Sequence, residues 1–265
     1  MKKRYKLQNI IIHDYFQNFG GGERLVKILL TKKFHKLIVG YDNNIFKKYF
    51  FKNIKLQTLF SFNTPEIIKK ILLINKFSNL SVYCKNCICS GNYSLFTEIH
   101  AKNKIAYIHS IPKIFFRQKY FYSKFSIKAI LAKIIFFNFK KKYVEKINKF
   151  DHLVANSYFT QRQLKKLTKK KIHVIYPPIE TFKIKQREKF LNYYVFNNRH
   201  EIEKNLYEVL LAFRVLTKEK LIVLSKGSLT ENLKRKFSDC KNIEFKGLVS
   251  NKKYIDYITN CKAVI

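Results

Sequence analysis

The sequence has little glycine, proline or acidic side chain, and it has no tryptophan. Seven glycines and four prolines in 265 residues exclude a collagen-like or low-complexity chain. An apolar run of about 18 residues, the length that crosses a membrane, is missing as well. The nearest run, Ile127 to Phe139, is interrupted by Lys128 and Lys133. The apolar segment Leu7 to Ile12 is too short for the core of a signal sequence, so we expect none.

Acidic residues are so few that the chain is strongly basic. Its 54 lysines and arginines exceed 17 aspartates and glutamates, for a net charge of +37. Only eight of the basic residues are arginine, the side chain that nucleic-acid binders use for bidentate contacts. An A/T-rich genome would produce this preference for lysine unaided. Because 47% of the residues are apolar, the chain can bury a core despite its charge. The positive charge permits a nucleic-acid partner but does not indicate one.

The five cysteines are an odd number in a chain without a signal sequence, which indicates free thiols in a reducing cytoplasm. They are Cys84, Cys87, Cys89, Cys240 and Cys261. The spacing of the first three could suggest zinc, but no second ligand cluster with metal spacing follows. We therefore expect buried thiols on a strand and no metal.

Strand-like apolar runs alternate with helical patterns along the whole chain. Strands are expected at Leu7–Ile12, Lys36–Tyr41, Leu80–Cys89, Lys104–His109, Asp151–Ala155, Ile172–Tyr176, Tyr193–Phe196, Leu221–Leu224 and Ile243–Phe245, and from Ala263. Helices are expected at Glu23–Leu30, Pro65–Lys76, Ser157–Leu167, Glu203–Leu216, Glu231–Phe237 and Lys252–Ile258. Such alternation requires crossover connections and predicts an α/β fold with parallel sheets.

The pattern restarts after Pro177 and Pro178, beyond a charged linker at Lys183–Lys189. The chain is therefore predicted to form two doubly wound domains, residues 1–178 and 179–265, with a ligand cleft between their strand ends. The second domain offers few strands, and the sequence stops inside the apolar run Cys261–Ile265. We expect this domain to be incomplete and the chain to be truncated at its C-terminus.

Gly20, Gly21 and Gly22 follow the first strand and open a helix. Glycines let a phosphate or sugar approach the backbone, and a helix start offers unpaired N–H donors. The second half of both a dinucleotide-binding fingerprint and a P-loop is missing. A plain turn with a helix cap is the alternative, but three successive glycines among only seven favour a ligand role.

Arg199 and Lys204 bracket a strand-to-helix turn at the start of the second domain. Their spacing lets both cations converge on one diphosphate, where arginine clasps oxygens bidentately and lysine adds a point charge. Taken alone, the pair is more simply explained as two solvated cations among 54.

His109 ends a strand, where catalytic groups gather in parallel sheets, and it could contact a sugar or a leaving group. A capped structural histidine is equally compatible with the sequence. His13 and Asp14 follow the first strand in the same way, and they are either sugar contacts or part of a turn.

The stretch from Phe115 to Phe150 is basic, aromatic and mostly helical in its pattern. A helix of this kind can lie in a membrane interface and attract anionic lipids. It can equally pack on the sheet with its lysines in solvent, and the sequence does not decide between the two.

These segments, in this order, resemble the retaining glycosyltransferases of family 4, most closely the mannosyltransferase-like branch that builds lipopolysaccharide O-antigen and capsule chains. The similarity covers nearly the whole chain, and the collinear order of individually weak motifs makes it specific. The motifs are IIHDYFQNFGGGERLV (11–26), SGNYSLF (90–96), KIAYIHSIPKIFFR (104–117), DHLVANSYFTQRQLKK (151–166), VIYPPIE (174–180), NYYVFNNRHEIEKNLYEVLLAF (192–213) and NIEFKGLVSNKKYIDYITNCKAVI (242–265).

The resemblance implies a GT-B fold of two Rossmann-like domains. It implies transfer of a mannose-like hexose, with retained configuration, from a nucleotide-diphosphate sugar to a lipid-linked or polysaccharide acceptor. No metal or other cofactor would be required, and the enzyme would be cytoplasmic, peripheral on the inner face of the bacterial plasma membrane. Gly21 and Gly22 match the glycine loop beside the donor diphosphate and acceptor. His109 matches a histidine near the transferred sugar, and Arg199 and Lys204 match the pair that binds the diphosphate.

Two departures from the family pattern matter. Ser225-Lys226-Gly227 stands where relatives often have a glycine–acid–glycine turn. The paired-glutamate element that grips the sugar and ribose would begin beyond Ile265, so we expect little transfer from these 265 residues alone.

Two other classes of function remain alternatives. The chain could be an inactive remnant that acts at most as a sugar- or partner-binding module. It could also be a basic nucleic-acid-binding protein, which would bind with a steep salt dependence. The second alternative is the weaker one, because the sequence contains no recognisable nucleic-acid module.

Overall fold

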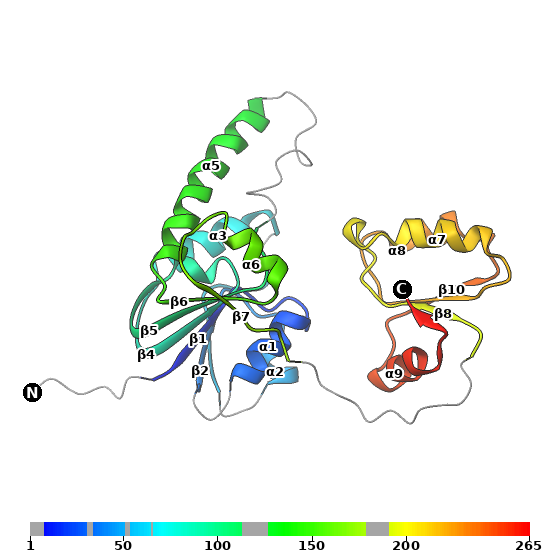
Figure 1. Ribbon diagram of the computed structural model, residues 1–265, viewed down its shortest axis with the longest axis horizontal. Helices are drawn as coiled ribbons and strands as arrows, with labels where there is room; N and C mark the ends of the chain where they lie inside the picture. Colours follow the sequence, from blue (N-terminus) through cyan, green and yellow to red (C-terminus); the bar gives the residue numbers. More distant parts are fainter. Residues whose placement is uncertain (1–7, 31–33, 51–53, 65, 113–126, 179–190) are drawn as a thin grey trace, which may run out of the picture. The chain divides into compact units, whose positions relative to one another are not determined.

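The computed structural model describes residues 8–30, 34–50, 54–64, 66–112, 127–178 and 191–265 (Figure 1). The chain forms two compact units, Met1–Ile179 and Glu180–Ile265. Each unit is built around a parallel sheet with helices on both faces.

The first unit contains a seven-stranded parallel sheet in the order β3-β2-β1-β4-β5-β6-β7. Its strands are β1 (Ile10–His13), β2 (Lys36–Val39), β3 (Lys55–Thr58), β4 (Ser81–Ser90), β5 (Glu98–Ile108), β6 (His152–Ala155) and β7 (Ile172–Val174). The chain runs from β1 outward to β3, then returns to β4 and runs outward on the other side. The direction of winding therefore switches between β1 and β4, and ligands bind at such points, outside the carboxyl ends of the strands.

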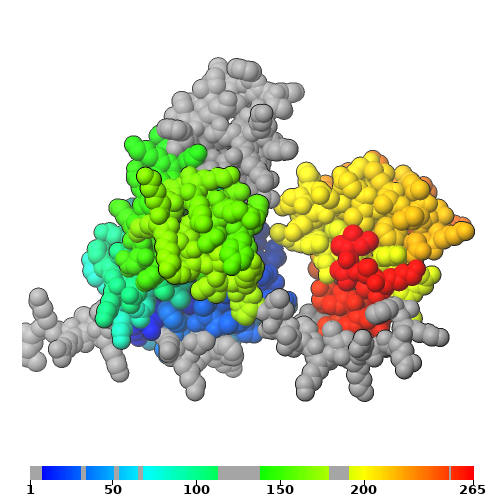
Figure 2. All heavy atoms as spheres, in the orientation of Figure 1, coloured from blue at the N-terminus to red at the C-terminus, as the bar shows by residue number. Residues whose placement is uncertain are grey.

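Helices cover both faces of this sheet. They are α1 (Gly21–Leu29), α2 (Ile45–Tyr49), α3 (Glu66–Ser78), α5 (Ile127–Asn148) and α6 (Tyr158–Leu164), with the short 3₁₀ helix η1 (Ser94–Phe96). Side chains alternate across β1, so Ile11 packs with α1 and α2, while Ile10 and Ile12 pack with α3, α5 and α6. In the space-filling view, α6 and the segment leading to β7 (yellow-green) cover the front of this unit (Figure 2).

The second unit has four parallel strands in the order β10-β9-β8-β11. They are β8 (Tyr194–Phe196), β9 (Leu221–Leu224), β10 (Ile243–Gly247) and β11 (Ala263–Val264), and the helices are η3 (Ile202–Lys204), α7 (Leu206–Val215), α8 (Thr230–Lys236) and α9 (Asn251–Asn260). Helices α7 and α8 pack on one face and α9 on the other. Both sheets are thus doubly wound and parallel, which confirms the predicted fold class.

Several elements differ from the sequence-based expectation. The short helix α2 and the strand β3 were not predicted, because β3 (KLQT) is an exposed edge strand without an apolar run. Strand β5 begins at Glu98 rather than Lys104, since its polar first half pairs with β4 and stays partly exposed. In the second unit, the helix expected from Glu203 is divided into η3 and α7 by Asn205, whose φ of 52° is left-handed.

The basic aromatic stretch is described from α5 onward, and residues 113–126 lie outside the described part of the chain. At the C-terminal end of α5, Tyr143 and Ile147 are fully buried against the sheet, and Phe150 follows them into the same core. This end of the stretch therefore packs as a covering helix, with Lys141 and Lys142 exposed. Among the described helices, none combines the length and apolar character needed to cross a membrane.

The prediction of buried thiols on a strand is confirmed. Cys84, Cys87 and Cys89 are free thiols buried in β4, the strand next to β1. A hydrogen bond with Cys87 and burial raise the pKa of Cys84, which keeps that thiol protonated. In the described residues, no group of three or more histidine, cysteine or acidic side chains is arranged to hold a metal ion.

The packing of α3 gives a direct test of this core. Leu73 is 1% exposed and Ile71, on the same helix, is 66% exposed. We expect Leu73→Ala to lower the free energy of unfolding by about 2–5 kcal/mol, because it leaves a cavity in the core. Ile71→Ala should change it by less than about 0.5 kcal/mol. Urea unfolding followed by circular dichroism measures both, and equal effects would contradict the packing described here.

Candidate functional site

The candidate site lies where β1, β4 and β5 end. His13 is the last residue of β1, Ser90 is the last residue of β4, and His109 directly follows β5. The parallel register pairs His13 with Ser90, and Ser90 with Tyr107 of β5. Three polar side chains that are far apart in the sequence therefore meet at the point where the winding switches direction.

A hydrogen-bonded row joins these three side chains. The Ser90 hydroxyl oxygen lies 3.2 Å from His13 Nδ1 and 2.8 Å from His109 Nε2. Ser90 is fully buried, His13 is 5% exposed and His109 is half-buried. Because a hydroxyl carries one proton, Ser90 donates to one ring and accepts an N–H from the other, so the tautomers of the two histidines are coupled.

Both imidazoles are neutral at pH 7. Burial, with a smaller contribution from the charge of His109, lowers the pKa of His13 to about 3. Burial also lowers the pKa of His109 to about 4. The row therefore offers hydrogen-bond donors and acceptors of fixed orientation, without a positive charge.

The first turn of α1 lies beside these imidazoles. A Cβ atom added to Gly22 would lie 3.6 Å from His13 Cε1 and 3.9 Å from His109 Cε1, whereas one added to Gly21 would meet no atom within 4 Å. Neither glycine has a positive φ, so the backbone does not require glycine at these positions. Gly21 therefore leaves open space at the start of α1, whereas a side chain at Gly22 would contact both histidines. The Glu23 carboxylate accepts the Gly20 N–H at 2.9 Å at this helix N-terminus, and the following N–H groups of the first turn favour an anion.

Asp14 holds the neighbouring loop. Its carboxylate accepts hydrogen bonds from the backbone N–H groups of Asn92, Tyr93 and Ser94 at 2.7–2.8 Å. Burial nevertheless raises the pKa of Asp14 to about 6. Gly91, with a φ of 128°, lets the loop approach, because a Cβ there would lie 2.3 Å from the carboxylate. Asp14 thus positions the segment after β4.

The loop also connects to α5. The Tyr143 hydroxyl donates to the side-chain oxygen of Asn92 at 2.8 Å, next to the backbone N–H that Asp14 accepts. Tyr143 is fully buried, so the covering helix and the site share one hydrogen-bond network.

The second unit places Arg199 and Lys204 around one turn, as predicted. Arg199 lies in the loop after β8, and Lys204 ends η3, just before α7. Both are exposed, and no ion pair within the described residues engages either of them. Between them, His200 is fully buried: its Nε2 donates to the Leu224 carbonyl at 3.0 Å, and its Nδ1 lies 2.9 Å from the Thr230 hydroxyl.

The loop after β9 packs against this turn. Ser225 adopts a left-handed φ of 78°, and its N–H donates to the Gly247 carbonyl at 2.7 Å. The carboxylate of Glu201 accepts hydrogen bonds from Ser228, through its N–H at 3.1 Å and its hydroxyl at 2.7 Å. The segment Ser225-Lys226-Gly227, which differs from the glycine–acid–glycine turn of the resembled family, therefore forms an ordered turn beside the loop that carries Arg199.

The structure brings together four of the predicted residues, namely Gly21, Gly22, His13 and His109. It adds Ser90 and His200, which the sequence analysis missed. Ser90 begins the SGNYSLF segment at the end of a strand, and a hydroxyl at that point was the available signal. His200 directly follows Arg199 in the turn that leads to Lys204, and the sequence gives no sign that this histidine is buried.

Comparisons with known proteins identify the fold. No protein-family model matches the chain, and no curated protein matches it either. WaaG, a solved glycosyltransferase involved in lipopolysaccharide biosynthesis, superimposes with a TM-score of 0.61 at 9% identity, over 97% of this chain and 74% of WaaG. HepE from Anabaena, solved with UDP, gives 0.60 at 12% identity, over 97% and 73%.

A third structure, the UDP-N-acetylglucosamine 2-epimerase of Rickettsia bellii, gives a TM-score of 0.57 at 12% identity, over 97% of this chain and 73% of the epimerase. At such identities the likeness shows the fold alone. The protein has the GT-B fold of two parallel-sheet units, as the sequence predicted. Because transferases and an epimerase share this fold, activity has to be argued from the site.

The histidine row predicts a pH dependence. The folded-state pKa values of His13 and His109 lie below 6.5, so the folded state binds fewer protons than the unfolded state in mild acid. The two neutral histidines contribute fully to the free energy of unfolding above pH 6.5, and this contribution decreases as the pH falls toward about 4. Asp14 has the opposite effect on stability, because its pKa is raised to about 6 in the folded state. Its contribution to the free energy of unfolding increases as the pH falls from about 6 to about 4.

We therefore expect the wild type to lose stability between pH 7.5 and pH 5, and His109→Gln to lose about 2 kcal/mol less, since it removes one suppressed protonation. Urea unfolding at both pH values measures this difference. Imidazole NMR signals, assigned with the variants, should show both rings still neutral at pH 5. A His109 ring that titrates near pH 6.5 would contradict its burial.

Proposed function

We propose that this protein is a glycosyltransferase that takes a sugar from a nucleotide-diphosphate donor. The observation that carries the proposal is the row of His13, Ser90 and His109 beside the glycine turn that opens α1, at the switch point of a GT-B sheet. Among known structures, HepE supports the proposal, because it has the same fold and was crystallised with UDP.

The first unit would hold the reacting sugar. His109 keeps Nε2 on Ser90, which fixes the ring and directs its other nitrogen toward a hydrogen bond with a sugar hydroxyl. Because the ring is neutral, it orients the sugar without adding charge. His13, more deeply buried, would support this arrangement or contact the sugar edge. The N–H groups at the start of α1 would face the acceptor or the diphosphate through the gap at Gly21 and Gly22.

The second unit would hold the leaving group. Arg199 and Lys204 are exposed cations at the carboxyl edge of β8, on a turn that His200 anchors to β9 through Leu224. Negative charge develops on the diphosphate as the glycosidic bond breaks, and two positioned cations stabilise it. An anchored turn needs little rearrangement when the donor binds, which makes the stabilisation larger.

The finer assignments follow from the resemblance alone and are part of this proposal. They are a mannose-like hexose, retention of anomeric configuration, a lipid-linked or polysaccharide acceptor in cell-surface glycan synthesis, and action without a metal. A cytoplasmic enzyme at the inner membrane face would suit the basic surface, which attracts anionic lipids. Nucleic acid is not proposed as a partner.

Gly21→Ala separates a ligand role from a structural one. A Cβ at this position meets no protein atom, and alanine is the better helix former, so the variant should be as stable as the wild type or up to about 1 kcal/mol more stable. If a ligand occupies the space, nucleotide-sugar affinity should fall at least about tenfold. Calorimetric titration with UDP-, GDP- and ADP-sugars, together with urea unfolding, measures both. Unchanged affinity would show that this space is not used for the donor or for groups coupled to it.

The decisive experiment replaces both cations. Arg199→Ala with Lys204→Ala should weaken nucleotide-sugar binding by about 100-fold, because two charge-assisted contacts to the diphosphate are lost. Arg235→Ala with Lys241→Ala is the matched control, since it removes the same charges from exposed positions of the same unit. Equal losses in the two double variants, or no loss in the first, would overturn the proposed function. Product analysis with a labelled donor then tests whether the configuration is retained.

A further inference from the structure

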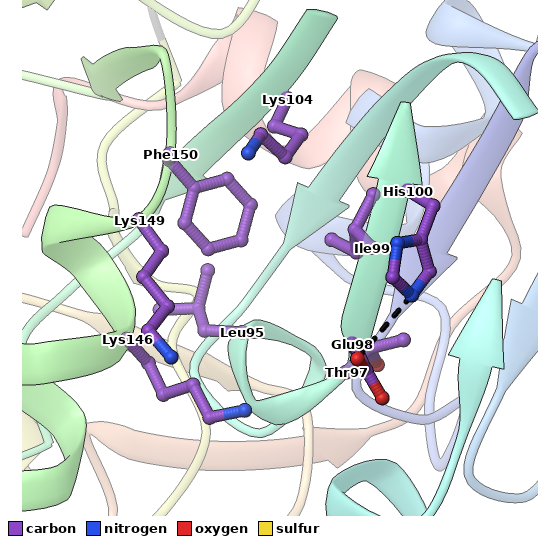
Figure 3. A pocket seen from close by; sticks show the side chains of 9 residues that line it. All are labelled: Leu95, Thr97, Glu98, Ile99, His100, Lys104, Lys146, Lys149 and Phe150. Carbon is purple, nitrogen blue, oxygen red and sulfur yellow. Dashed lines mark ion pairs between the residues drawn. The ribbon is translucent and has the colours of Figure 1, made fainter. Parts of the chain in front are cut away.

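A cavity of about 210 Å³ lies in the first unit, between the first half of β5 and the C-terminal end of α5 (Figure 3). It is distinct from the histidine row. Lys104, the cavity residue nearest to that end of β5, is five positions before His109, about 16 Å along an extended strand. The rest of the cavity extends further toward the start of the strand, at Thr97.

The polar lining of the cavity is mainly cationic. Lys104 comes from β5, Lys146 comes from the last turn of α5, and Lys149 directly follows that helix. The one acidic side chain in the lining, Glu98, is paired with His100 at 3.3 Å (Figure 3). Like charges around a partly enclosed space repel one another, and an anion in that space removes the repulsion.

Lys146 is oriented for this role. Its ammonium donates to the Phe96 carbonyl at 2.8 Å, which holds the side chain in place and leaves two of its three N–H bonds for other acceptors. Burial and the nearby charge of Lys149 lower the pKa of Lys146, and the charge of Glu98 opposes them only in part; a bound anion would offset both lowering effects.

The Thr97 hydroxyl is not part of the binding surface. Thr97 lines the cavity and is 4% exposed, but its hydroxyl oxygen is inaccessible to solvent and has no hydrogen-bond partner among the described residues. An occupant of the cavity would therefore be held by the lysines and the apolar walls.

The remaining walls limit the size and character of the occupant. Leu95, Ile99 and Phe150 provide apolar surface, and the volume corresponds to roughly seven water molecules. An occupant would therefore combine a small anionic group with a short carbon body. Phosphate suits the cations better than a carboxylate does, because its oxygens can reach several donors at once.

We propose that this cavity binds a small phosphorylated molecule, with the phosphate on Lys104, Lys146 and Lys149 and the carbon body against Leu95 and Phe150. None of these residues belongs to the histidine row or to the cationic turn of the second unit. The site can therefore exist whether or not the protein transfers sugars.

Direct titration of the full chain tests the proposal. Inorganic phosphate and glycerol 3-phosphate are the soluble probes, followed by calorimetry and by the amide NMR signals of Thr97 and Lys104. Lys146→Gln should lower the affinity for glycerol 3-phosphate at least tenfold. Lys142→Gln removes the same charge from an exposed position on the same helix, outside the cavity lining, and should leave the affinity unchanged. Equal losses in the two variants would overturn the proposal, because they would indicate general attraction to a basic surface.

A second variant keeps the test independent of folding defects. Lys149→Gln removes a charge from an exposed side chain of the lining, so the ligand-free protein should be about as stable as the wild type. Its affinity for glycerol 3-phosphate should nevertheless fall severalfold, and an undiminished affinity would overturn the placement of the phosphate on these lysines. Sedimentation with phosphatidic acid vesicles identifies the source of the phosphate. Binding to vesicles that depends on Lys146 and not on Lys142 would assign it to a lipid headgroup, whereas soluble binding alone would assign it to a free metabolite.

Discussion

The shared proton of Ser90 is the interaction on which the site of the first unit depends. One hydroxyl lies between two imidazoles that burial keeps neutral, so the three groups can form hydrogen bonds in only two tautomeric arrangements. The parallel register sets their separation, because it places the last residues of β1 and β4 opposite each other and brings the end of β5 beside them. A shift of one residue in either strand pairing would turn one of these side chains to the other face of the sheet.

A second layer of contacts fixes the surroundings of this row. The carboxylate of Asp14 accepts three backbone N–H groups of the loop after Ser90, and Tyr143 of α5 binds Asn92 in that loop. In the second unit, His200 holds the turn that carries Arg199 in a similar way, through hydrogen bonds with Thr230 and Leu224. In both units a buried polar side chain holds a loop at the carboxyl ends of the strands. Under the proposed function, the exposed neighbours of these anchors would contact the ligand.

The sequence predicted the fold well because its strongest signals are periodic and local. Apolar runs for β1, β2 and β9 and amphipathic patterns for α1 and α7 are visible in single segments. The first half of β5 and the edge strand β3 could not be found in this way, since polar strands are recognised only by their partners. The sequence indicated candidate residues where glycine or histidine follows a strand, as at Gly21, His13 and His109, and the structure places His13 and His109 in one hydrogen-bonded row. Ser90 and His200 were not predicted, because their hydrogen-bond partners lie 19 to 77 positions away in the sequence. Only the strand register and the packing specify such contacts.

The thiols of β4 have a further consequence for how this protein can be observed in solution. Cys84, Cys87 and Cys89 lie inside the sheet next to β1, whereas Cys240 is partly accessible in the other unit. A thiol reagent can therefore reach the three internal sulfurs only when the sheet opens, and the rate of their alkylation reports that opening without any added label. In a chain without tryptophan, these cysteines are a natural reporter of cooperative motion at the very strand that ends in Ser90.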